Sequence, residues 1–349
     1  MIADDKLASL GWRPHLAAQV HGADDSELEI ARVVAVHRGR VELAGPGATR
    51  FVNLTGKSAN FGITVGDWVL IDDDGPSVKR RLERFSLFQR RAAGTSGDIQ
   101  LIAANVDTLF IVTSANRDFN IARLERYLAI AHDAGAYPVI VISKADKVDS
   151  VAEYVTEASR LSPGLLVEAL DAREADQVGV LRSWCKSGQT VALVGSSGVG
   201  KSTIINTLTG EHLLTHGVRE DDQRGRHTTT GRSMHALPDG GWLIDTPGMR
   251  ELQLVDVADA LDDVFSDVAK LAASCRFADC THTTEPQCAV LAAIEAGELD
   301  GDRLRRYQKL LSEDRRNTES LADRRSRDRA LGKFYKSVMS GKRREKGGD

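Results

Sequence analysis

The stretch GSSGVGKST comprises Gly195, Ser196, Ser197, Gly198, Val199, Gly200, Lys201, Ser202 and Thr203. It has a glycine, four further residues and then Gly-Lys-Ser, which is the pattern of a phosphate-binding loop. Residues 190–194 (TVALV) precede it as an apolar run typical of a strand, and residues 203–208 (TIINTL) follow with the pattern of a helix. Because the loop requires this strand, loop and helix context, a chance glycine-rich turn is disfavoured. The stretch therefore predicts an α/β nucleotide-binding domain.

Each residue type in this loop has a chemical role in binding the phosphates of a nucleotide. Gly195, Gly198 and Gly200 allow backbone N–H groups to turn toward a phosphate at a helix N-terminus, where the helix dipole favours an anion. We expect Lys201 to reach the β- and γ-phosphates and the Ser202 hydroxyl to bind Mg²⁺. The position of the loop is unusual, because nearly two hundred residues precede it, whereas in most proteins of this type it opens the domain.

A second polar motif, formed by Ser143, Lys144, Ala145 and Asp146, follows the apolar run of residues 137–143. Lysine, any residue and aspartate at the end of a strand is typical of guanine recognition in GTPases. Asp146 would accept hydrogen bonds from guanine N1–H and the 2-amino group, while the stem of Lys144 lies along the base. Adenine lacks this donor pair, so the motif predicts discrimination on the order of 10⁴-fold. A surface Lys-Asp turn after a strand is the alternative.

Two candidate switch loops follow the phosphate loop. Residues 225–231 (GRHTTTG) contain His227 and three threonines, one of which would close on Mg²⁺ when γ-phosphate is present; the pattern does not distinguish among the three. Residues 242–248 (WLIDTPG) end a predicted strand with Asp-x-x-Gly, where Asp245 would hold Mg²⁺ through water and the Gly248 N–H would sense the γ-phosphate. Loops that order and disorder with nucleotide state act as switches.

The functional segments therefore occur in the order base recognition, phosphate loop, first switch and second switch. Ordinary GTPases have the phosphate loop and the switches before base recognition, so the order predicts a circularly permuted GTPase domain, which binds GTP and GDP. Compact domains tolerate the joining of old termini and the opening of new ones. In the permuted order the second switch leads directly into the C-terminal part of the chain, which γ-phosphate loss would move.

Downstream of the second switch, the chain has metal-ligand spacing at Cys275, Cys280, His282 and Cys288. Three thiolates and one imidazole suit tetrahedral Zn²⁺, and a closed set of four ligands indicates a structural ion. The residues around the ligands include no compact apolar core, so the metal would supply folding energy that packing does not. Three free thiols beside a surface histidine are the alternative.

The remaining sequence predicts a multidomain chain. Residues 1–27 show no clear periodicity and predict a mostly irregular arm. Residues 28–92 contain glycine-broken β-type runs that predict a small β-barrel, with an RNA-binding OB-fold favoured over an SH3-like barrel or a barrel without an RNA role. Residues 93–265 would form the permuted GTPase domain around a parallel sheet covered on both faces. Residues 266–349 would form a small α-helical zinc-binding domain with a basic tail.

Two basic segments leave alternatives open. Residues 79–91 carry six positive charges interleaved with Phe85 and Phe88, which suits RNA backbone contact and base stacking or, equally, a solvated linker whose phenylalanines pack inward. From Arg303 to Asp349 there are 16 Lys/Arg against 7 Asp/Glu. We favour an RNA-binding tail over a merely solvated basic end.

The composition sets the broad class. The 349 residues are 42% hydrophobic and 28% charged, as in soluble globular proteins. No apolar run approaches the roughly 18 residues that span a bilayer, and the first residues lack the layout of a signal peptide. We therefore expect a cytoplasmic protein without membrane contact, and in a reducing compartment clustered cysteines indicate metal before disulfide.

With these motifs in hand, the chain resembles the ribosome small subunit-dependent GTPase A family from about Leu28 to Arg306. The resemblance is carried, in family order, by the OB-like region, residues 104–107 (ANVD), the base motif, GSSGVGKST, RGRHTTTG, DTPG and CRFADCTHTTEPQCAV. It implies an OB-fold, a permuted GTPase domain and a zinc domain that contact 16S rRNA. It also implies that GTP hydrolysis is stimulated by the 30S subunit during its late maturation, and we expect a monomer.

Two positions have consequences within this resemblance. Ser143 stands where the family usually has asparagine, and its side chain is expected to be too short to bridge the base and the phosphate-loop backbone, which predicts weaker nucleotide retention. Met249 follows Gly248 where many GTPases have the glutamine that orients water, so intrinsic hydrolysis should be slow. His227 is a candidate for positioning that water; the alternative is that it only contacts RNA or caps its loop.

The sequence thus predicts a GTPase that binds and releases the small ribosomal subunit. An RNA-binding chaperone, whose nucleotide site regulates affinity while turnover is incidental, is the alternative from another functional class. An ATP-using metabolic kinase is disfavoured by Asp146 and by the lack of a recognisable acceptor-substrate site. Val167, Glu168 and Ala169 lie where spacing places the last base-contacting loop, although their match to it is poor.

Overall fold

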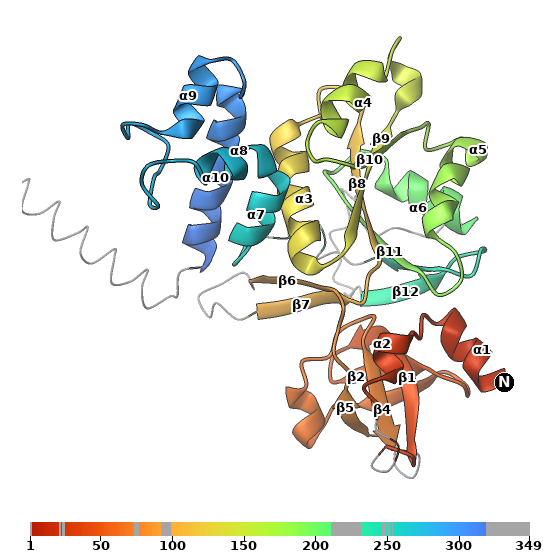
Figure 1. Ribbon diagram of the computed structural model, residues 1–349. Helices are drawn as coiled ribbons and strands as arrows, with labels where there is room; N and C mark the ends of the chain where they lie inside the picture. The colour runs from red at the N-terminus through yellow and green to blue at the C-terminus, as the bar shows by residue number, and fades with distance from the viewer. Residues whose placement is uncertain are drawn as a thin grey trace, which may run out of the picture.

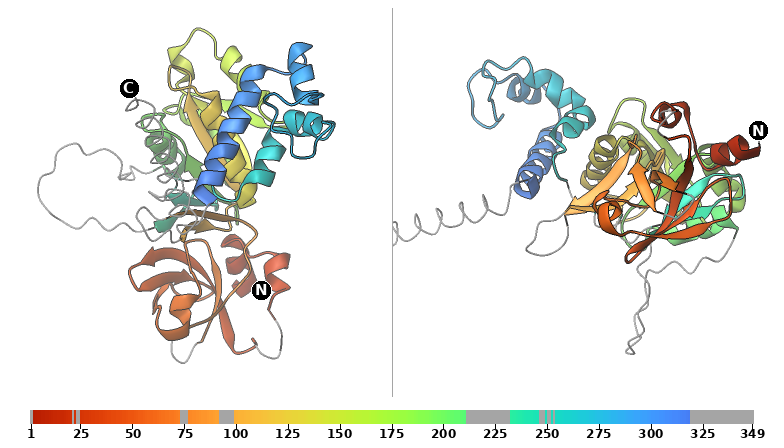
Figure 2. Two further views of the ribbon diagram at one scale, coloured as in Figure 1. Left: turned by 90° about the vertical axis from the view of Figure 1, so that its left-hand side faces the viewer. Right: turned by 90° about the horizontal axis from the view of Figure 1, so that it is seen from below.

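The computed structural model describes residues 2–20, 22, 25–72, 77–91, 99–210, 232–245, 249, 252 and 254–318. These residues form a β-barrel lobe, an α/β lobe and a helical lobe (Figure 1). Both views in Figure 2 place the helical lobe beside the α/β lobe. The α/β lobe is therefore the part of the molecule to which the other two are attached.

The α/β lobe is built on apolar strands: β8 (Thr108–Ser114), β9 (Tyr137–Ser143), β10 (Leu166–Ala169), β11 (Thr190–Val194), β12 (Arg232–Ala236) and β13 (Trp242–Asp245). Their order is β10-β9-β8-β11-β13-β12, in which all pairs are parallel except β13 with β12. Every residue of β8 and of β11 is buried, as expected for parallel strands covered on both faces. The predicted parallel sheet is confirmed.

Helices and short 3₁₀ segments connect these strands: α3 (Ile121–Ala134), η2 (Ala145–Lys147), α4 (Ala152–Ser159), α5 (Ala175–Val178), η3 (Gly179–Trp184) and α6 (Lys201–Thr209). Helix α3 has clear end signals, because the Asn120 side chain accepts from the Arg123 N–H and Gly135 ends the helix at a φ of 77°. Residues 175–184 form one turn of α-helix, α5, followed directly by the 3₁₀ helix η3, and the change occurs at Gly179, a poor helix former.

The barrel lobe contains β1 (Leu28–His37), β2 (Arg40–Ala44), β3 (Arg50–Asn53), η1 (Gly56–Asn60), β4 (Trp68–Asp72) and β5 (Val78–Arg81). Its strands pair antiparallel in the order β3-β2-β1-β4-β5. Alternate apolar side chains fill the interior, among them Val33, Val41, Val52 and Val69, which have no exposed surface. The predicted small OB-type barrel is confirmed.

The barrel and the α/β sheet are continuous. Strand β1 pairs antiparallel with β12, with Ala35 opposite Ser233 and Val36 opposite Arg232. The hairpin of β6 (Leu87–Arg91) and β7 (Ile99–Ala104) lies between the two lobes in Figure 1 and spans the predicted domain boundary at residues 92 and 93. Strand β12 directly precedes β13, so the barrel is hydrogen-bonded to the strand next to Asp245.

The N-terminal arm is folded, contrary to the expectation of an irregular segment. It forms α1 (Ile2–Ser9) and α2 (Pro14–Ala17). Three leucines of this arm, Leu7, Leu10 and Leu16, are buried. They form one cluster with the barrel residues Trp68, Leu70 and Leu82. Helices of this length are marginal by themselves, so their stability comes from this tertiary packing, which periodicity does not reveal.

The basic segment at residues 79–91 is largely structural. Phe88 is 1% exposed and packs in the main hydrophobic core, so it is not available to stack on a base. Arg84 donates from Nε to Asp67 Oδ1 at 2.6 Å, and the buried Asp67 is 0% exposed. For Phe88 and Arg84, inward packing is therefore the correct alternative.

The helical lobe consists of α7 (Ala258–Val264), α8 (Ser266–Ala272), α9 (Ala289–Glu295) and α10 (Gly301–Thr318). A buried ion cluster docks it on the α/β lobe, because the fully buried Glu125 of α3 accepts from Arg303 at 3.1 Å and from Arg306 at 2.8 Å. Arg303 also donates to Val264 O and Asp267. The basic tail beyond Thr318 lies outside the described residues.

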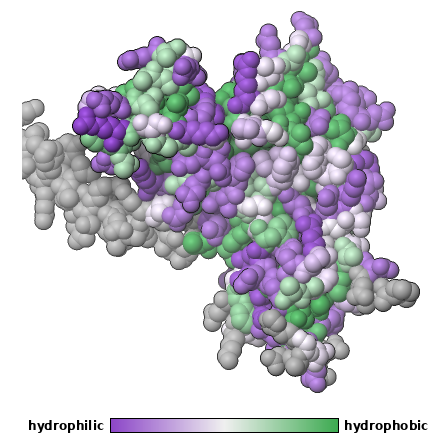
Figure 3. Space-filling view, in the orientation of Figure 1, coloured by the Kyte–Doolittle hydropathy of each residue, from purple (hydrophilic) through white to green (hydrophobic). Residues whose placement is uncertain are grey.

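The surface seen in Figure 3 mixes hydrophilic and hydrophobic side chains, and no continuous apolar belt crosses this face. Among the helices that the structure describes, none combines the length and the apolar character needed to cross a bilayer.

Candidate nucleotide and zinc sites

The sheet brings the predicted nucleotide-binding segments to one edge. In the strand registers, Ser143 lies opposite Ser114 and Val194 lies opposite Ile111, while Ala192 of β11 lies opposite Ile244 of β13. These strands are parallel, so the base motif after β9, the phosphate loop after β11 and Asp245 at the end of β13 share the carboxyl edge. Ligands of open α/β sheets bind at this edge.

The phosphate loop has the backbone geometry that its glycines permit. Gly195 has a φ of 141°, and a Cβ there would meet Val112 O at 2.2 Å. Gly200, at a φ of 94°, ends the loop immediately before α6. The ammonium of Lys201 is held inside the loop, where Nζ donates to Gly195 O at 2.7 Å and to Ser196 O. The lysine is 7% exposed, so it is directed into the turn rather than into solvent.

Two oxygen donors suit the expected magnesium ion. Ser202 lies in the first turn of α6, and Asp245 ends β13, the parallel neighbour of β11; both are half-buried. Mg²⁺ prefers oxygen ligands and keeps part of its water shell, so a hydroxyl and a carboxylate at one sheet edge fit it. His227, the three threonines of the first switch and Gly248 lie outside the described residues.

The side chain of Ser143 contacts the backbone of the phosphate loop. Its hydroxyl lies 2.5 Å from Val199 O and 3.0 Å from Thr113 O, and the residue is fully buried. The serine therefore ties the end of β9 to the phosphate-loop backbone. The expected effect of Ser143 on nucleotide retention, which concerned a bridge from the loop to the base, stays a prediction.

The base motif leaves the sheet in a tight turn. Lys144 has a φ of 59°, and the Ala145 N–H donates to Leu170 O at 3.3 Å. The carboxylate of Asp146 accepts from Arg173 at 2.8 Å and from Lys147 at 2.7 Å. Asp146 thus lies at the sheet edge with a cationic partner from another loop.

The segment after β10 supplies residues that sequence reasoning missed. Val167, Glu168 and Ala169 lie within β10, whereas the contacts to the base motif come from the residues that follow it, beginning at Leu170. Ala172 O accepts from Thr207 of α6 at 2.9 Å, which joins this segment to the helix of the phosphate loop. In the sequence, the role of this segment is indicated only by its position after the carboxyl end of β10, the strand adjacent to β9.

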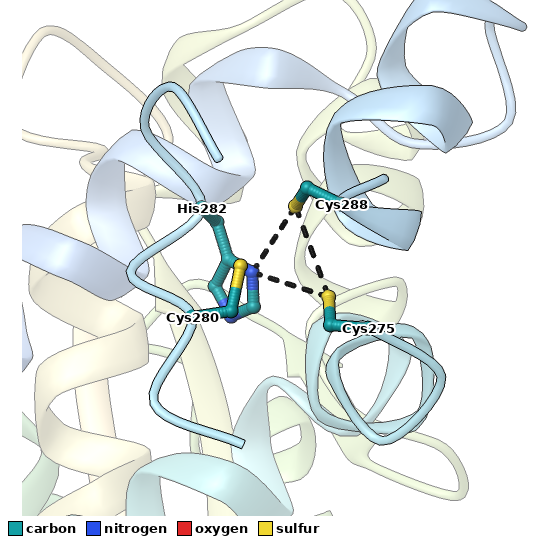
Figure 4. A group of neighbouring side chains, drawn as sticks. All are labelled: Cys275, Cys280, His282 and Cys288. Atoms are coloured by element: carbon teal, nitrogen blue, oxygen red, sulfur yellow. Dashed lines mark hydrogen bonds between the residues drawn. The ribbon is translucent and has the colours of Figure 1, made fainter. Parts of the chain in front are cut away.

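The four predicted zinc ligands converge. Figure 4 shows Cys275, Cys280, His282 and Cys288 pointing toward one another, and their candidate ligand atoms all lie within 4.8 Å of one another. His282 Nδ1 lies 3.6 Å from Cys275 Sγ and 3.4 Å from Cys288 Sγ. Tetrahedral zinc with bonds of about 2.3 Å to sulfur places two sulfurs about 3.8 Å apart, and the Cys275 and Cys288 sulfurs are 3.8 Å apart. The donor set therefore fits one structural zinc ion.

Glu285 organises the loop that carries His282, a role that sequence reasoning missed. Its carboxylate accepts from the N–H groups of Thr281, Thr283 and Thr284 at 2.8, 2.8 and 3.0 Å, and from the Thr281 hydroxyl. The hydrogen bond from the Thr281 side chain, followed by those from backbone N–H groups, lowers the pKa of Glu285. An ionised Glu285 thus holds the histidine loop in position near neutral pH.

Loss of one thiolate should remove the zinc. In Cys280→Ser, we expect zinc to be lost on dialysis against a chelator that the wild-type protein withstands, because a hydroxyl is a poor substitute for a thiolate ligand. Metal analysis by inductively coupled plasma mass spectrometry measures zinc per chain. Cys185→Ala is the matched control, because Cys185 is buried outside the cluster. Retention of zinc by Cys280→Ser would show that the four side chains are not the ligand set.

Comparisons with known proteins agree with this geometry. A family model described as RsgA GTPase matches residues 81–255. The small ribosomal subunit biogenesis GTPase RsgA 2 of Vibrio parahaemolyticus is 50% identical over 339 residues, which are 97% of this chain and 94% of that protein. The small ribosomal subunit biogenesis GTPase RsgA of Mesorhizobium japonicum is 48% identical over 316 residues, covering 89% and 91% of the two chains.

Solved structures agree on the fold. The crystal structure of YjeQ from Thermotoga maritima superposes with a TM-score of 0.62 at 26% identity, and the match covers 82% of this chain and 98% of that chain. YloQ, described as a circularly permuted GTPase, gives a TM-score of 0.59 at 21% identity and covers 86% and 99% of the two chains. The permuted order of motifs, the shared sheet edge and the extent of these matches lead to one conclusion. The chain belongs to the RsgA GTPase family and is a GTPase.

Proposed function

We propose that this GTPase binds the 30S ribosomal subunit through 16S rRNA during late subunit maturation and that the subunit stimulates its conversion of GTP to GDP and phosphate. The names of the curated relatives, which describe small ribosomal subunit biogenesis GTPases, support the small subunit as partner. Such a protein would act as a cytoplasmic monomer. His227 then becomes the candidate that positions water once RNA orders its loop.

The nucleotide roles follow from the shared sheet edge. Lys201 would contact the β- and γ-phosphates from within the phosphate loop, and Ser202 and Asp245 would hold Mg²⁺, which neutralises charge that develops on the phosphates. Asp146 would accept the guanine N–H groups. Because the phosphate loop is held by Ser143 and by the bond from Lys201 to Gly195 O, little reorganisation of the loop backbone would be needed when nucleotide binds.

The observation that carries the RNA part of the proposal is an aromatic and basic surface on the barrel. Phe51 of β3 is 51% exposed, with the Arg40 guanidinium 4.6 Å from its ring centroid and the His37 ring 5.8 Å away. An exposed ring flanked by a guanidinium and an imidazole suits an unpaired RNA base and its phosphates. Strand β1, which carries His37, also pairs with β12 and so connects this surface to the GTPase sheet.

The decisive experiment is co-sedimentation with 30S, 50S and 70S particles in GDP and in a nonhydrolysable GTP analogue. We expect binding to 30S particles that is stronger with the GTP analogue, because ordered switches would let the lobes bind RNA together. Phosphate release with and without 30S subunits tests the enzymatic part. Stimulated release supports a GTPase cycle, whereas nucleotide-dependent binding without stimulation supports the RNA chaperone alternative.

Truncation of the exposed ring should weaken 30S binding. For Phe51→Ala we expect about a tenfold rise in the Kd for 30S subunits, because stacking of one base on an aromatic ring contributes about 1–3 kcal/mol. Tyr137→Ala is the matched control, since Tyr137 is 49% exposed at the start of β9, on a strand of the α/β lobe rather than on β3. Equal effects of the two substitutions on the sedimented fraction would argue against a specific role for Phe51.

A further inference from the structure

Arg173 joins two carboxylates beside the base motif. Its Nη2 donates to Asp146 Oδ2 at 2.8 Å and to Asp171 Oδ2 at 2.7 Å, and its Nε donates to Asp171 Oδ1 at 3.0 Å. The Arg173 N–H donates to the same Oδ1 at 3.0 Å. Asp171 therefore holds the guanidinium by a two-point contact, the geometry in which arginine pairs best with a carboxylate.

The pair between Arg173 and Asp171 does not depend on Asp146. Hydrogen bonds from the side chain and then the backbone of Arg173 lower the pKa of Asp171 to about 2. Asp171 is thus ionised throughout the physiological pH range. If the guanidinium leaves Asp146, it keeps an anionic partner.

Guanine and Arg173 need the same carboxylate. Recognition of guanine uses both oxygens of Asp146, one for N1–H and the other for the 2-amino group. Asp146 Oδ2 already accepts from Arg173 and forms an ion pair with the Lys147 ammonium at 2.7 Å. A carboxylate oxygen has two lone pairs, so guanine must displace at least one of these cations. Arg173 can leave Asp146 most readily, because its guanidinium remains paired with Asp171 when it does so.

We propose that Arg173 is an internal competitor of the guanine base for Asp146 and thereby sets the affinity of the protein for guanine nucleotides. This inference rests on the proposed role of Asp146 as the base acceptor. The protein binds nucleotide only in the fraction of molecules whose Asp146 has been released.

The competition has a kinetic signature. Rotamer changes of an exposed side chain take picoseconds to nanoseconds, far faster than nucleotide encounter, so competition reduces the apparent association rate constant and leaves dissociation unchanged. Arg173 is 60% exposed, and an exposed ion pair shifts an equilibrium by about threefold. A residue that instead stacked on the bound base would slow dissociation, which is a different outcome.

The test is stopped-flow binding of N-methylanthraniloyl-GDP to the full chain. We expect Arg173→Ala to raise the association rate constant about threefold and to lower the Kd equally, with the dissociation rate constant unchanged. Arg173→Gln, which keeps most of the stem without the charge, should behave in the same way. Removing a positive charge would by itself slow the association of anionic GDP. A rise in the association rate constant therefore indicates competition rather than a general charge effect.

Arg182→Ala is the matched control. Arg182 forms a similar exposed pair with Asp239 at 2.8 Å, outside the base motif, and its removal should leave dissociation unchanged and association unchanged or slightly slower. An unchanged or reduced association rate for both Arg173 variants, or faster dissociation, would overturn the competition.

Asp146→Asn separates this inference from the base assignment on which it rests. Weaker GDP binding by Asp146→Asn together with wild-type kinetics for the Arg173 variants would refute the competition alone. Unchanged GDP binding by Asp146→Asn would refute Asp146 as the base acceptor.

Discussion

Replacing Arg32 with methionine is expected to lower the free energy of unfolding by about 3–5 kcal/mol, because it leaves several buried acceptors without their donor at about 1–3 kcal/mol each. The guanidinium is 1% exposed at the contact of the barrel, the N-terminal arm and the α/β sheet. It donates to Leu10 O, to Asn105 O at 3.2 Å and to Thr190 Oγ1 at 2.8 Å. Burial lowers the pKa of Arg32 to about 10, so it remains charged at neutral pH.

The expected cost is large because the acceptors cannot be removed with the arginine. A buried ion pair can be replaced by apolar residues at little cost only when both partners change, whereas two of the acceptors here are backbone carbonyls. Methionine fills much of the volume and leaves those carbonyls without this donor. The Arg32 guanidinium also lies 5.6 Å from the Trp68 ring centroid, so packing on that ring changes as well.

Urea unfolding followed by tryptophan fluorescence measures the effect on Arg32→Met. An m-value equal to that of the wild-type protein would indicate that the same unit unfolds, which the comparison of free energies requires. Arg182→Met is the control; it breaks an exposed pair, and we expect a loss of at most about 1 kcal/mol. Similar losses for the two variants would mean that the buried network contributes no more than a surface pair.

Replacing Lys201 with methionine is expected to reduce GTP turnover by about 10²–10³-fold, the cost of removing one donor that stabilises developing charge. The lysine is enclosed by the loop, and its ammonium bonds to Gly195 O at 2.7 Å. Exchange of carbonyl partners for phosphate oxygens would require little movement of the loop. Water cannot replace the charge easily, because Lys201 is 7% exposed.

Phosphate release at saturating 30S subunits measures the turnover of Lys201→Met. Lys186→Met, which removes an exposed lysine of the same lobe, should retain wild-type turnover. Circular dichroism establishes that both variants are folded. Turnover of Lys201→Met within a few-fold of the control would exclude the lysine from stabilising the reacting phosphates.

Local sequence patterns determined the order of motifs, most strands and the zinc ligands. The strands β8, β9 and β11 are continuous apolar runs, and such runs end where polar residues begin, so their carboxyl ends could be located. The phosphate loop was identifiable because its glycines adopt backbone conformations that other residues avoid. The ligand spacing from Cys275 to Cys288 reflects a coordination geometry that is local in the chain.

Tertiary structure alone decided the contacts between segments far apart in the chain. Hydrophobic periodicity does not specify which surfaces of the chain meet. Such meetings decide the pairing of β1 with β12, the burial of Phe88, the folding of the N-terminal arm and the hydrogen bonds of Arg32. The same holds at the nucleotide site, where Ser143 reaches Val199 and Arg173 reaches Asp146 because parallel strands bring their carboxyl ends together. The sequence determined the chemistry of the phosphate loop, whereas the fold decided that Ser143 supports the backbone of this loop and that Arg173 lies against Asp146.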